Sequence, residues 1–166
     1  MPEKKTIARA HKDKEEGKAP STQAGEFVRE EMEHIREGKH GARSTKQAIA
    51  IGLSKARRAG VKLPAPRKGK TSEKTREAAK RDLKKGKKAA ESKPAAKRSG
   101  ATRTALQREG RKAASSEALS KQARSAAAKR TKTDRSAAAK KAGRTKGPAK
   151  RSEAARKAAE TRAAES

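Results

Sequence analysis

The last hundred residues of this chain hold too few large apolar side chains to build a hydrophobic core. Residues 67–166 contain 33 Lys or Arg and 10 Asp or Glu, but only three large apolar residues, Leu83, Leu106 and Leu119. Burial of large apolar side chains is what offsets the conformational entropy lost when a chain becomes ordered. This segment is therefore predicted to be largely disordered and to act as a long polycation.

The other large apolar residues all lie within the first 66 residues, and this number supports one small folded unit at most. The chain has no Cys, which excludes a disulfide framework and a thiolate metal site but leaves the redox compartment open. Its charged start lacks the apolar stretch of a secretory signal, and nowhere do 18 apolar residues run together. Secretion and membrane spanning are therefore not expected.

Two segments of the N-terminal part have the apolar spacing of amphipathic helices. The first ends near Gly38, a residue that suits a helix C-terminus, and predicts a helix over about 22–37. In the second, Ser44 and Gln47 form a capping-box pattern before an apolar stripe, which predicts a helix over about 45–59. The predicted fold class is all-α: a small helical hairpin resembling a helix-turn-helix, followed by a largely disordered, partly helical tail rich in Ala, Lys and Arg.

Composition divides the chain into four parts. Residues 1–20 are predicted to form a flexible charged arm or a short frayed helix, 21–62 the helical hairpin module, 63–72 a linker with Pro and Gly, and 73–166 a basic low-complexity tail. A hairpin of this size needs further stabilisation. Self-association into a homodimer through its two helices, folding on a partner, or cover from the N-terminal arm or a third helix would each supply it.

The charge balance indicates nucleic acid as the partner. The chain has 48 Lys or Arg and 19 Asp or Glu, a net charge of +29, of which residues 67–166 contribute +23. A field of this strength attracts polyanions and releases their condensed counterions when phosphates are neutralised. The predicted function is sequence-nonspecific binding and compaction of double-stranded DNA, as in nucleoid-associated, histone-H1-like proteins of the cytoplasm.

Two other classes of function stay open. Structured RNA or the ribosome presents the same phosphates, although DNA is the favoured partner. A protein-interaction module, antitoxin-like or adaptor-like, would instead use the apolar stripe of the hairpin and keep the tail for localisation. A membrane is not an expected partner, because the tail lacks the apolar face of interfacial helices. No small-molecule substrate is expected.

The candidate phosphate contacts are Lys and Arg side chains of the second predicted helix, the linker and the tail. The acids of the hairpin lie in its first helix, so the second helix is the one expected to contact nucleic acid if either does. Charge pairs between the two helices are the alternative, and both can hold. The candidates are Lys46, Lys55, Arg57, Arg58, Arg67, Lys68, Lys70, Lys84, Lys85, Lys87, Lys88, Lys97, Arg98, Arg124, Lys129, Arg130, Arg135, Lys140, Lys141, Arg144, Lys150 and Arg151.

No catalytic, cofactor or metal site is predicted. Glu31 and His34 have the spacing of a ligand pair in di-metal helical bundles, but the second predicted helix has no acid to complete such a site. His11 and His40 are expected to be exposed. The chain has no Tyr or Trp, so the base-stacking platforms of single-strand and RNA-recognition modules are missing. No nucleophile and base pair can be argued, and an enzyme is not expected.

The block STQAGEFVREEMEHIREGKHGARSTKQAIAIGLSKARRAGVKLP resembles a family of short, uncharacterised bacterial proteins classed as a domain of unknown function, some of them loosely labelled DNA-binding. The resemblance spans about Thr6 to Gly69, and the stretches AGEFVREE and STKQAIAIGLSKARRAG are its distinctive parts. The family has no established activity, so the resemblance implies none. The stretch SKPAAKRSGATRTALQREGRKAA is similar in composition to linker-histone tails and bacterial histone-H1-like proteins, which implies the same polycation behaviour.

Overall fold

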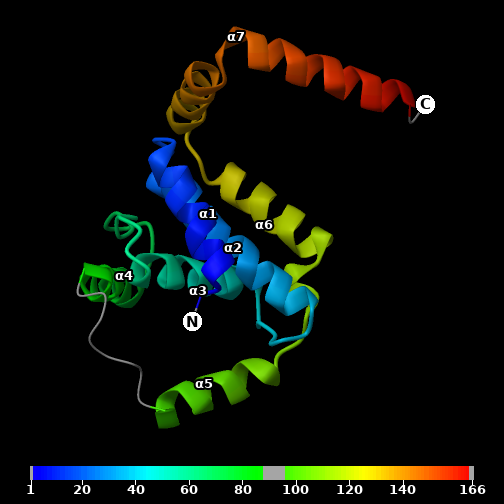
Figure 1. The fold of residues 1–166 in the computed structure, drawn as a ribbon. Coiled ribbons are helices and arrows are strands. Elements are labelled where there is room, and N and C mark those ends of the chain that lie inside the picture. The colour runs from blue at the N-terminus through cyan, green and yellow to red at the C-terminus, as the bar shows by residue number, and fades with distance from the viewer. Residues whose placement is uncertain (1, 88–95, 165–166) are drawn as a thin grey trace. The chain divides into compact units, whose positions relative to one another are not determined.

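A computed structural model describes residues 2–87 and 96–164, without the side chains of residues 87, 96–99, 145, 146, 150 and 151. The described chain is all-α, as predicted, and none of its residues lies in a strand (Figure 1). It divides into two compact units, Met1–Gln122 and Ala123–Ser166.

Within its described residues, 2–87 and 96–122, the first unit contains five helices, a short 3₁₀ helix and the beginning of a sixth helix. They are α1 (Lys4–Glu15), α2 (Pro20–Arg36), α3 (Thr45–Arg58), α4 (Glu73–Lys87), α5 (Ala96–Gln107), η1 (Lys112–Ala114) and the start of α6 (Ser116–Ala128). The predicted hairpin corresponds to α2 and α3 and is confirmed. At the start of α3, the amide N–H of Gln47 donates to Ser44 Oγ at 3.3 Å, and the amide N–H of Arg43 donates to Gln47 Oε1 at 2.8 Å.

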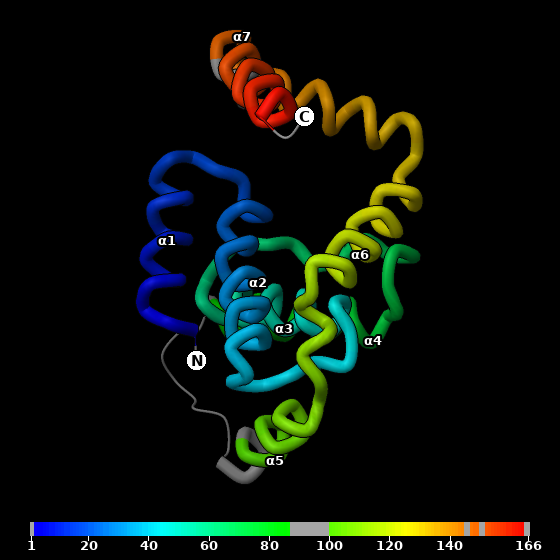
Figure 2. The backbone as a smooth tube through the Cα atoms, turned by 90° about the vertical axis from the view of Figure 1, so that its right-hand side faces the viewer, coloured from blue at the N-terminus to red at the C-terminus, as the bar shows by residue number. Residues whose placement is uncertain are grey.

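The predicted N-terminal arm forms the ordered helix α1, which packs against α2 (Figure 2). Ala10 is 3% exposed, and Arg9 Nε lies 2.7 Å from Glu26 Oε2 across the two helices. The sequence pattern did not settle this packing, because Ile7 is the only large apolar residue in α1. The contact depends on a small side chain, Ala10, that lets α1 approach α2 closely.

In the part of the first unit that the structure describes, two clusters of buried apolar side chains stabilise the fold. One lies among α1, α2, α3 and the chain that follows α3, and its buried members are Ala10, Ala24, Phe27, Ala56 and Val61. The other lies among α2, α3 and η1, and its buried members are Met32, Ile35, Ala42, Ala48, Ala113 and Ala114, with Leu119 packed against them. Residues 113–119 belong to the predicted tail, so part of that tail contributes to a core. Alanines make this possible, because they pack closely although they do not count among large apolar residues.

Helix α4 also belongs to the predicted tail, and it packs against α3. Asp82 of α4 is 8% exposed, and its carboxylate accepts hydrogen bonds from Ser54 Oγ at 2.6 Å and from Arg58 Nε at 2.8 Å. The apolar stripes of α2 and α3 are thus covered within one chain by α1, η1 and α4. The cover expected from a dimer or partner is supplied internally, and the homodimer stays an untested prediction.

Helices α2 and α3 approach each other closely at Gly52. A Cβ atom at this position would lie 2.7 Å from Val28 Cα and 2.9 Å from Val28 N. Both neighbours are backbone atoms, so a larger residue would force the helices apart. Gly25 of α2 is exposed, and a Cβ atom there would have no neighbour within 4 Å.

We expect Gly52→Ala to lower the free energy of unfolding by about 1–2 kcal/mol, because overpacking outweighs the better helix propensity of Ala. Gly25→Ala should raise it by about 0.5–1 kcal/mol, because only the propensity changes there. Urea unfolding followed by circular dichroism measures both. Equal effects of the two substitutions would contradict a close approach of the helices at Gly52.

The second unit consists of the end of α6 and of α7 (Lys132–Ala164), which is interrupted at Gly147 (φ 68°, ψ 168°) just before Pro148. From Ala123 to Ala164, every described side chain is exposed. The predicted partial helicity of the tail is confirmed for these residues. No described helix is both long enough and apolar enough to cross a membrane.

Candidate nucleic-acid interface

Exposed cationic side chains dominate the second unit. The described residues from Ala123 to Ala164 include eleven Lys or Arg and three acids, Asp134, Glu153 and Glu160. The predicted contacts among them are Arg124, Lys129, Arg130, Arg135, Lys140, Lys141 and Arg144, and all seven are exposed. Glu153 lies 3.0 Å from Lys157 Nζ, one helical turn away. The unit therefore presents a large excess of positive charge to solvent.

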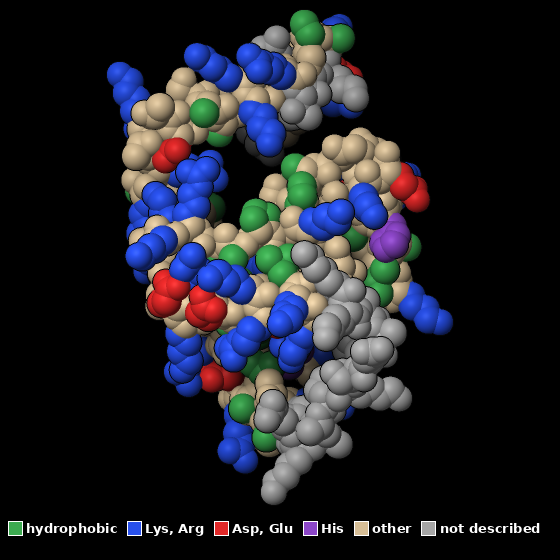
Figure 3. Space-filling view, turned by 90° about the vertical axis from the view of Figure 1, so that its left-hand side faces the viewer, with side chains coloured by type: hydrophobic (Ala, Val, Ile, Leu, Met, Phe, Trp, Pro, Cys, Tyr) green, Lys and Arg blue, Asp and Glu red, His purple; other side chains and the backbone are tan. Residues whose placement is uncertain are grey.

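Predicted contacts in the first unit outside α3 are also at the surface. Arg67, Lys68 and Lys70 of the linker and Lys84 and Lys85 of α4 are exposed. Figure 3 shows Lys and Arg outnumbering Asp and Glu on the face that it draws. Lys88 and the side chains of Lys87, Lys97, Arg98, Lys150 and Arg151 lie outside the described residues.

The candidate cations of α3 are mostly engaged within the fold. Lys46 is exposed, but Lys55 Nζ contacts Glu31 Oε1 and lies 3.6 Å from Glu30 Oε1. The acids Glu30 and Glu31 are 1% and 0% exposed. The predicted charge pairs between the hairpin helices therefore exist, with buried carboxylates. Releasing Lys55 to a phosphate would leave buried charge without a partner, and its contact with nucleic acid stays an untested prediction.

Arg57 and Arg58, at the end of α3, are likewise bound to the protein. Arg57 is 7% exposed, and its Nε and Nη2 donate to the carbonyl oxygens of Leu63 and Pro64 at 3.3 Å each. Burial lowers the pKa of the Arg57 guanidinium, and Asp82 acts in the opposite direction. Arg58 remains half exposed but pairs with Asp82 at 2.8 Å. Three of the four candidate cations of α3 are thus paired within the fold, and contact of α3 with nucleic acid stays an untested prediction.

The loop between α2 and α3 is held by a segment from the predicted tail. The amide N–H of Gly41 donates to the carbonyl of Leu106 at 2.8 Å, and that of Ala42 donates to Gly110 at 3.2 Å. A Cβ atom at Gly41 would lie 1.9 Å from the carbonyl oxygen of Glu109, so the approach requires glycine. The sequence offered no signal for this contact, because nothing in residues 106–110 specifies a distant partner.

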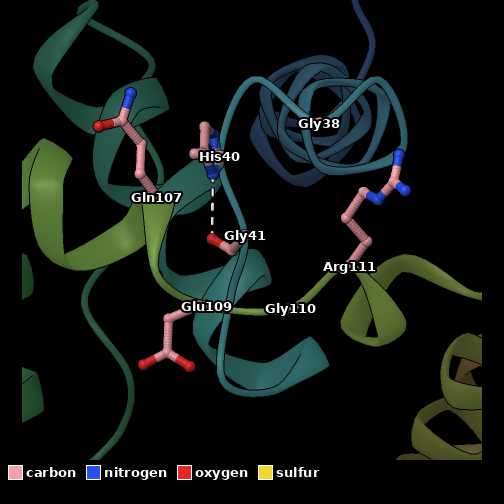
Figure 4. A pocket seen from close by; sticks show the side chains of 7 residues that line it. All are labelled: Gly38, His40, Gly41, Gln107, Glu109, Gly110 and Arg111. Atoms are coloured by element: carbon pink, nitrogen blue, oxygen red, sulfur yellow. Dashed lines mark hydrogen bonds between the residues drawn. The ribbon is translucent and has the colours of Figure 1, made fainter.

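An open hollow of about 360 Å³ lies beside this loop, lined by Gly38, His40, Gly41, Gln107, Glu109, Gly110 and Arg111 (Figure 4). The side chain of His40 is only 14% exposed, so the prediction that it is exposed is wrong. Its burial follows from the held loop, and its Nδ1 lies 3.0 Å from the carbonyl oxygen of Gly41. His11 is exposed, as predicted.

His40 of the loop belongs to a polar cluster with Glu31 and His34 of α2. Sequence reasoning did not bring these three residues together. His34 Nε2 lies 2.9 Å from Glu3 Oε1, and the rings of His34 and His40 meet edge to face with centroids 5.9 Å apart. Hydrogen bonds from His34 and then Lys39 lower the pKa of Glu3. The i, i+3 spacing of Glu31 and His34 was visible in the sequence, but the third member comes from the loop.

A protein-family model described as a family of unknown function (DUF6496) matches residues 13–68. The match covers α2, α3 and the loop between them, and it supports the resemblance to an uncharacterised domain. No curated protein and no solved structure matches the chain. The exposed cations of the second unit lie outside the matched residues, and bacterial origin and the histone-H1-like character of the tail stay predictions.

Proposed function

We propose that this protein binds double-stranded DNA without sequence preference, by neutralising phosphates with the cations of its C-terminal part. The supporting observation is the second unit, where eleven described Lys or Arg are exposed and only three acids accompany them. Over residues 123–166 the full sequence has 14 Lys or Arg and 4 Asp or Glu, a net charge of +10. Phosphate contacts from such a surface supply affinity that is independent of sequence.

The side chains available in this unit also favour nonspecific binding. Asn and Gln, which read adenine through paired hydrogen bonds, are absent from residues 123–166. Its Lys and Arg recur along α6 and α7 without gathering on one helical face. A helix that reads bases needs one face turned into the major groove, whereas phosphate neutralisation needs only charge within reach.

The first unit contributes to this function through its surface cations rather than through α3. Arg67, Lys68 and Lys70 of the linker are exposed and add to the positive charge available to phosphates. The apolar side chains of the hairpin are covered within the same chain, where α1, α4 and η1 pack against α2 and α3. This internal use gives no support to the alternative of a protein-interaction module that presents an open apolar stripe.

We expect the affinity for DNA to fall steeply with salt. If about ten phosphates are neutralised, log K should fall with log salt concentration at a slope near −9. Fluorescence anisotropy with two duplexes of unrelated sequence, each at several salt concentrations, measures this slope. Competition between ribosomal RNA and plasmid DNA at fixed salt tests the choice of polyanion.

A small slope, or tight binding to one duplex only, would contradict phosphate neutralisation as the source of affinity. Stronger competition by ribosomal RNA than by plasmid DNA would transfer the proposal to structured RNA.

A further inference from the structure

Three side chains able to bind a metal ion converge where α2 meets the loop that follows it. Glu31 and His34 come from α2, and His40 comes from the loop. Among the described residues, one ligand atom from each lies within 4.8 Å of the others. We propose that Glu31, His34 and His40 bind one zinc ion. This site is separate from the cations to which we attribute DNA binding.

The carboxylate of Glu31 has one oxygen free for this role. Glu31 is 0% exposed, and its Oε1 contacts Lys55 Nζ. Its Oε2 is buried without a hydrogen-bond partner and lies 3.5 Å from His40 Nε2. A buried, unpaired carboxylate oxygen is costly, because burial removes its hydration without a replacement. A metal ion beside Oε2 would remove that cost and leave the contact with Lys55 in place.

Both imidazoles are oriented with a lone pair toward Glu31. His40 Nδ1 lies 3.0 Å from the Gly41 carbonyl, which can only accept, so Nδ1 holds the proton and Nε2 is free to bind a metal. His34 Nε2 likewise faces the Glu3 carboxylate at 2.9 Å, which leaves Nδ1 free, 4.0 Å from Glu31 Oε1. Metal-binding histidines nearly always donate their other N–H to a carbonyl or carboxylate in this way.

Two imidazole nitrogens and one carboxylate oxygen form a ligand set typical of zinc. Bonds of about 2.0–2.1 Å in a tetrahedral site place ligand atoms about 3.3 Å apart. Glu31 Oε2 and His40 Nε2 are 3.5 Å apart, which is already near that separation. The three ligand atoms lie within 4.8 Å of one another, so they would have to approach by about 1.5 Å at most. Side-chain rotation of His34 can supply this movement. Three protein ligands leave a fourth position for water.

The charge of the cluster also fits a divalent cation. Glu31 belongs to the cluster, the Glu3 carboxylate lies 2.9 Å from His34 Nε2, and the buried Glu30 carboxylate shares Lys55 with Glu31. Lys39 Nζ lies 3.4 Å from Glu3 Oε1 but is closer, at 2.8 Å, to Glu37 Oε2. With neutral histidines, these three carboxylates and Lys55 leave two negative charges, which one zinc ion neutralises.

The test measures zinc binding by the full chain, freed of nucleic acid and of metal, through competition with a chromogenic zinc indicator. We expect one ion per chain. His34→Ala and His40→Ala should each weaken binding at least about tenfold, and Glu3→Gln, which removes an outer partner of a ligand, about 10–100-fold. His11→Ala is the matched control, because His11 is exposed on α1, and it should leave the affinity unchanged.

Equal zinc affinity of the wild-type chain and the His34→Ala, His40→Ala double variant would overturn the proposal. Because either substitution can disturb the loop, a second measurement uses the wild-type protein alone. In ¹⁵N-resolved NMR spectra of the imidazoles, zinc should shift His34 Nδ1 and His40 Nε2 and leave His11 unchanged. Unchanged resonances of His34 and His40 when zinc is added would equally refute a metal site.

Discussion

Replacing the Lys and Arg of residues 123–166 by Gln reduces the affinity for double-stranded DNA by about a thousandfold or more at 0.1 M salt. Each phosphate contact releases about 0.9 counterion, so at this salt concentration each contact contributes a factor of about eight to the binding constant. Loss of about four contacts among the 14 cations therefore suffices. The salt slope should become less steep by about 4 at the same time. Anisotropy titrations of the variant and the parent chain measure both quantities.

The matched control exchanges Lys for Arg, and Arg for Lys, at the same positions. It keeps the charge of the second unit and changes only the shape of the charged groups, so we expect affinity within about tenfold of the parent chain. Circular dichroism checks that both variants keep similar helix content. If the Gln variant bound DNA as tightly as the parent chain, the first unit would be the binding part, and the proposed role of residues 123–166 would be wrong.

Phe27→Ala lowers the free energy of unfolding of the first unit by about 3–5 kcal/mol. Phe27 is 1% exposed and packs in the cluster that joins α1, α2 and α3. The loss is a large share of the roughly 5–15 kcal/mol by which domains are stable, so the unit should be largely unfolded at moderate urea. Urea unfolding followed by circular dichroism measures it. DNA affinity should nevertheless stay within about tenfold, because accumulated charge needs no folded core.

Ile51→Ala serves as the control, because Ile51 is a large apolar residue of α3 that is only partly buried and belongs to neither core cluster. We expect a clearly smaller loss of stability. Equal losses for the two variants would mean that the cluster around Phe27 does not organise the unit. A collapse of DNA affinity in Phe27→Ala would show that the folded shape takes part in binding.

The sequence predicts α2 and α3 well because their signals are local. Apolar spacing, the Ser44 cap and the glycine near the end of α2 act within a turn or two of the helix. The excess of charge after residue 66 is likewise a property of composition alone. The sequence leaves the cover of the hairpin open among a homodimer, a partner, the N-terminal arm and a third helix, and does not determine that α1, α4 and η1 supply it. Their contacts use Ala10, Ala113 and Ala114, and alanine is too frequent in this chain to mark a core position.

The candidate nucleic-acid and zinc sites also differ in whether local sequence or tertiary contacts determine them. The exposure of the described cations in residues 123–164 follows from a segment without large apolar side chains, so the sequence alone determines it. Only the tertiary structure assigns Lys55 to buried carboxylates and brings His40 to Glu31. The physical reason is distance along the chain: the loop that holds His40 is hydrogen-bonded to residues 106–110, and no local rule of helix formation reaches that far.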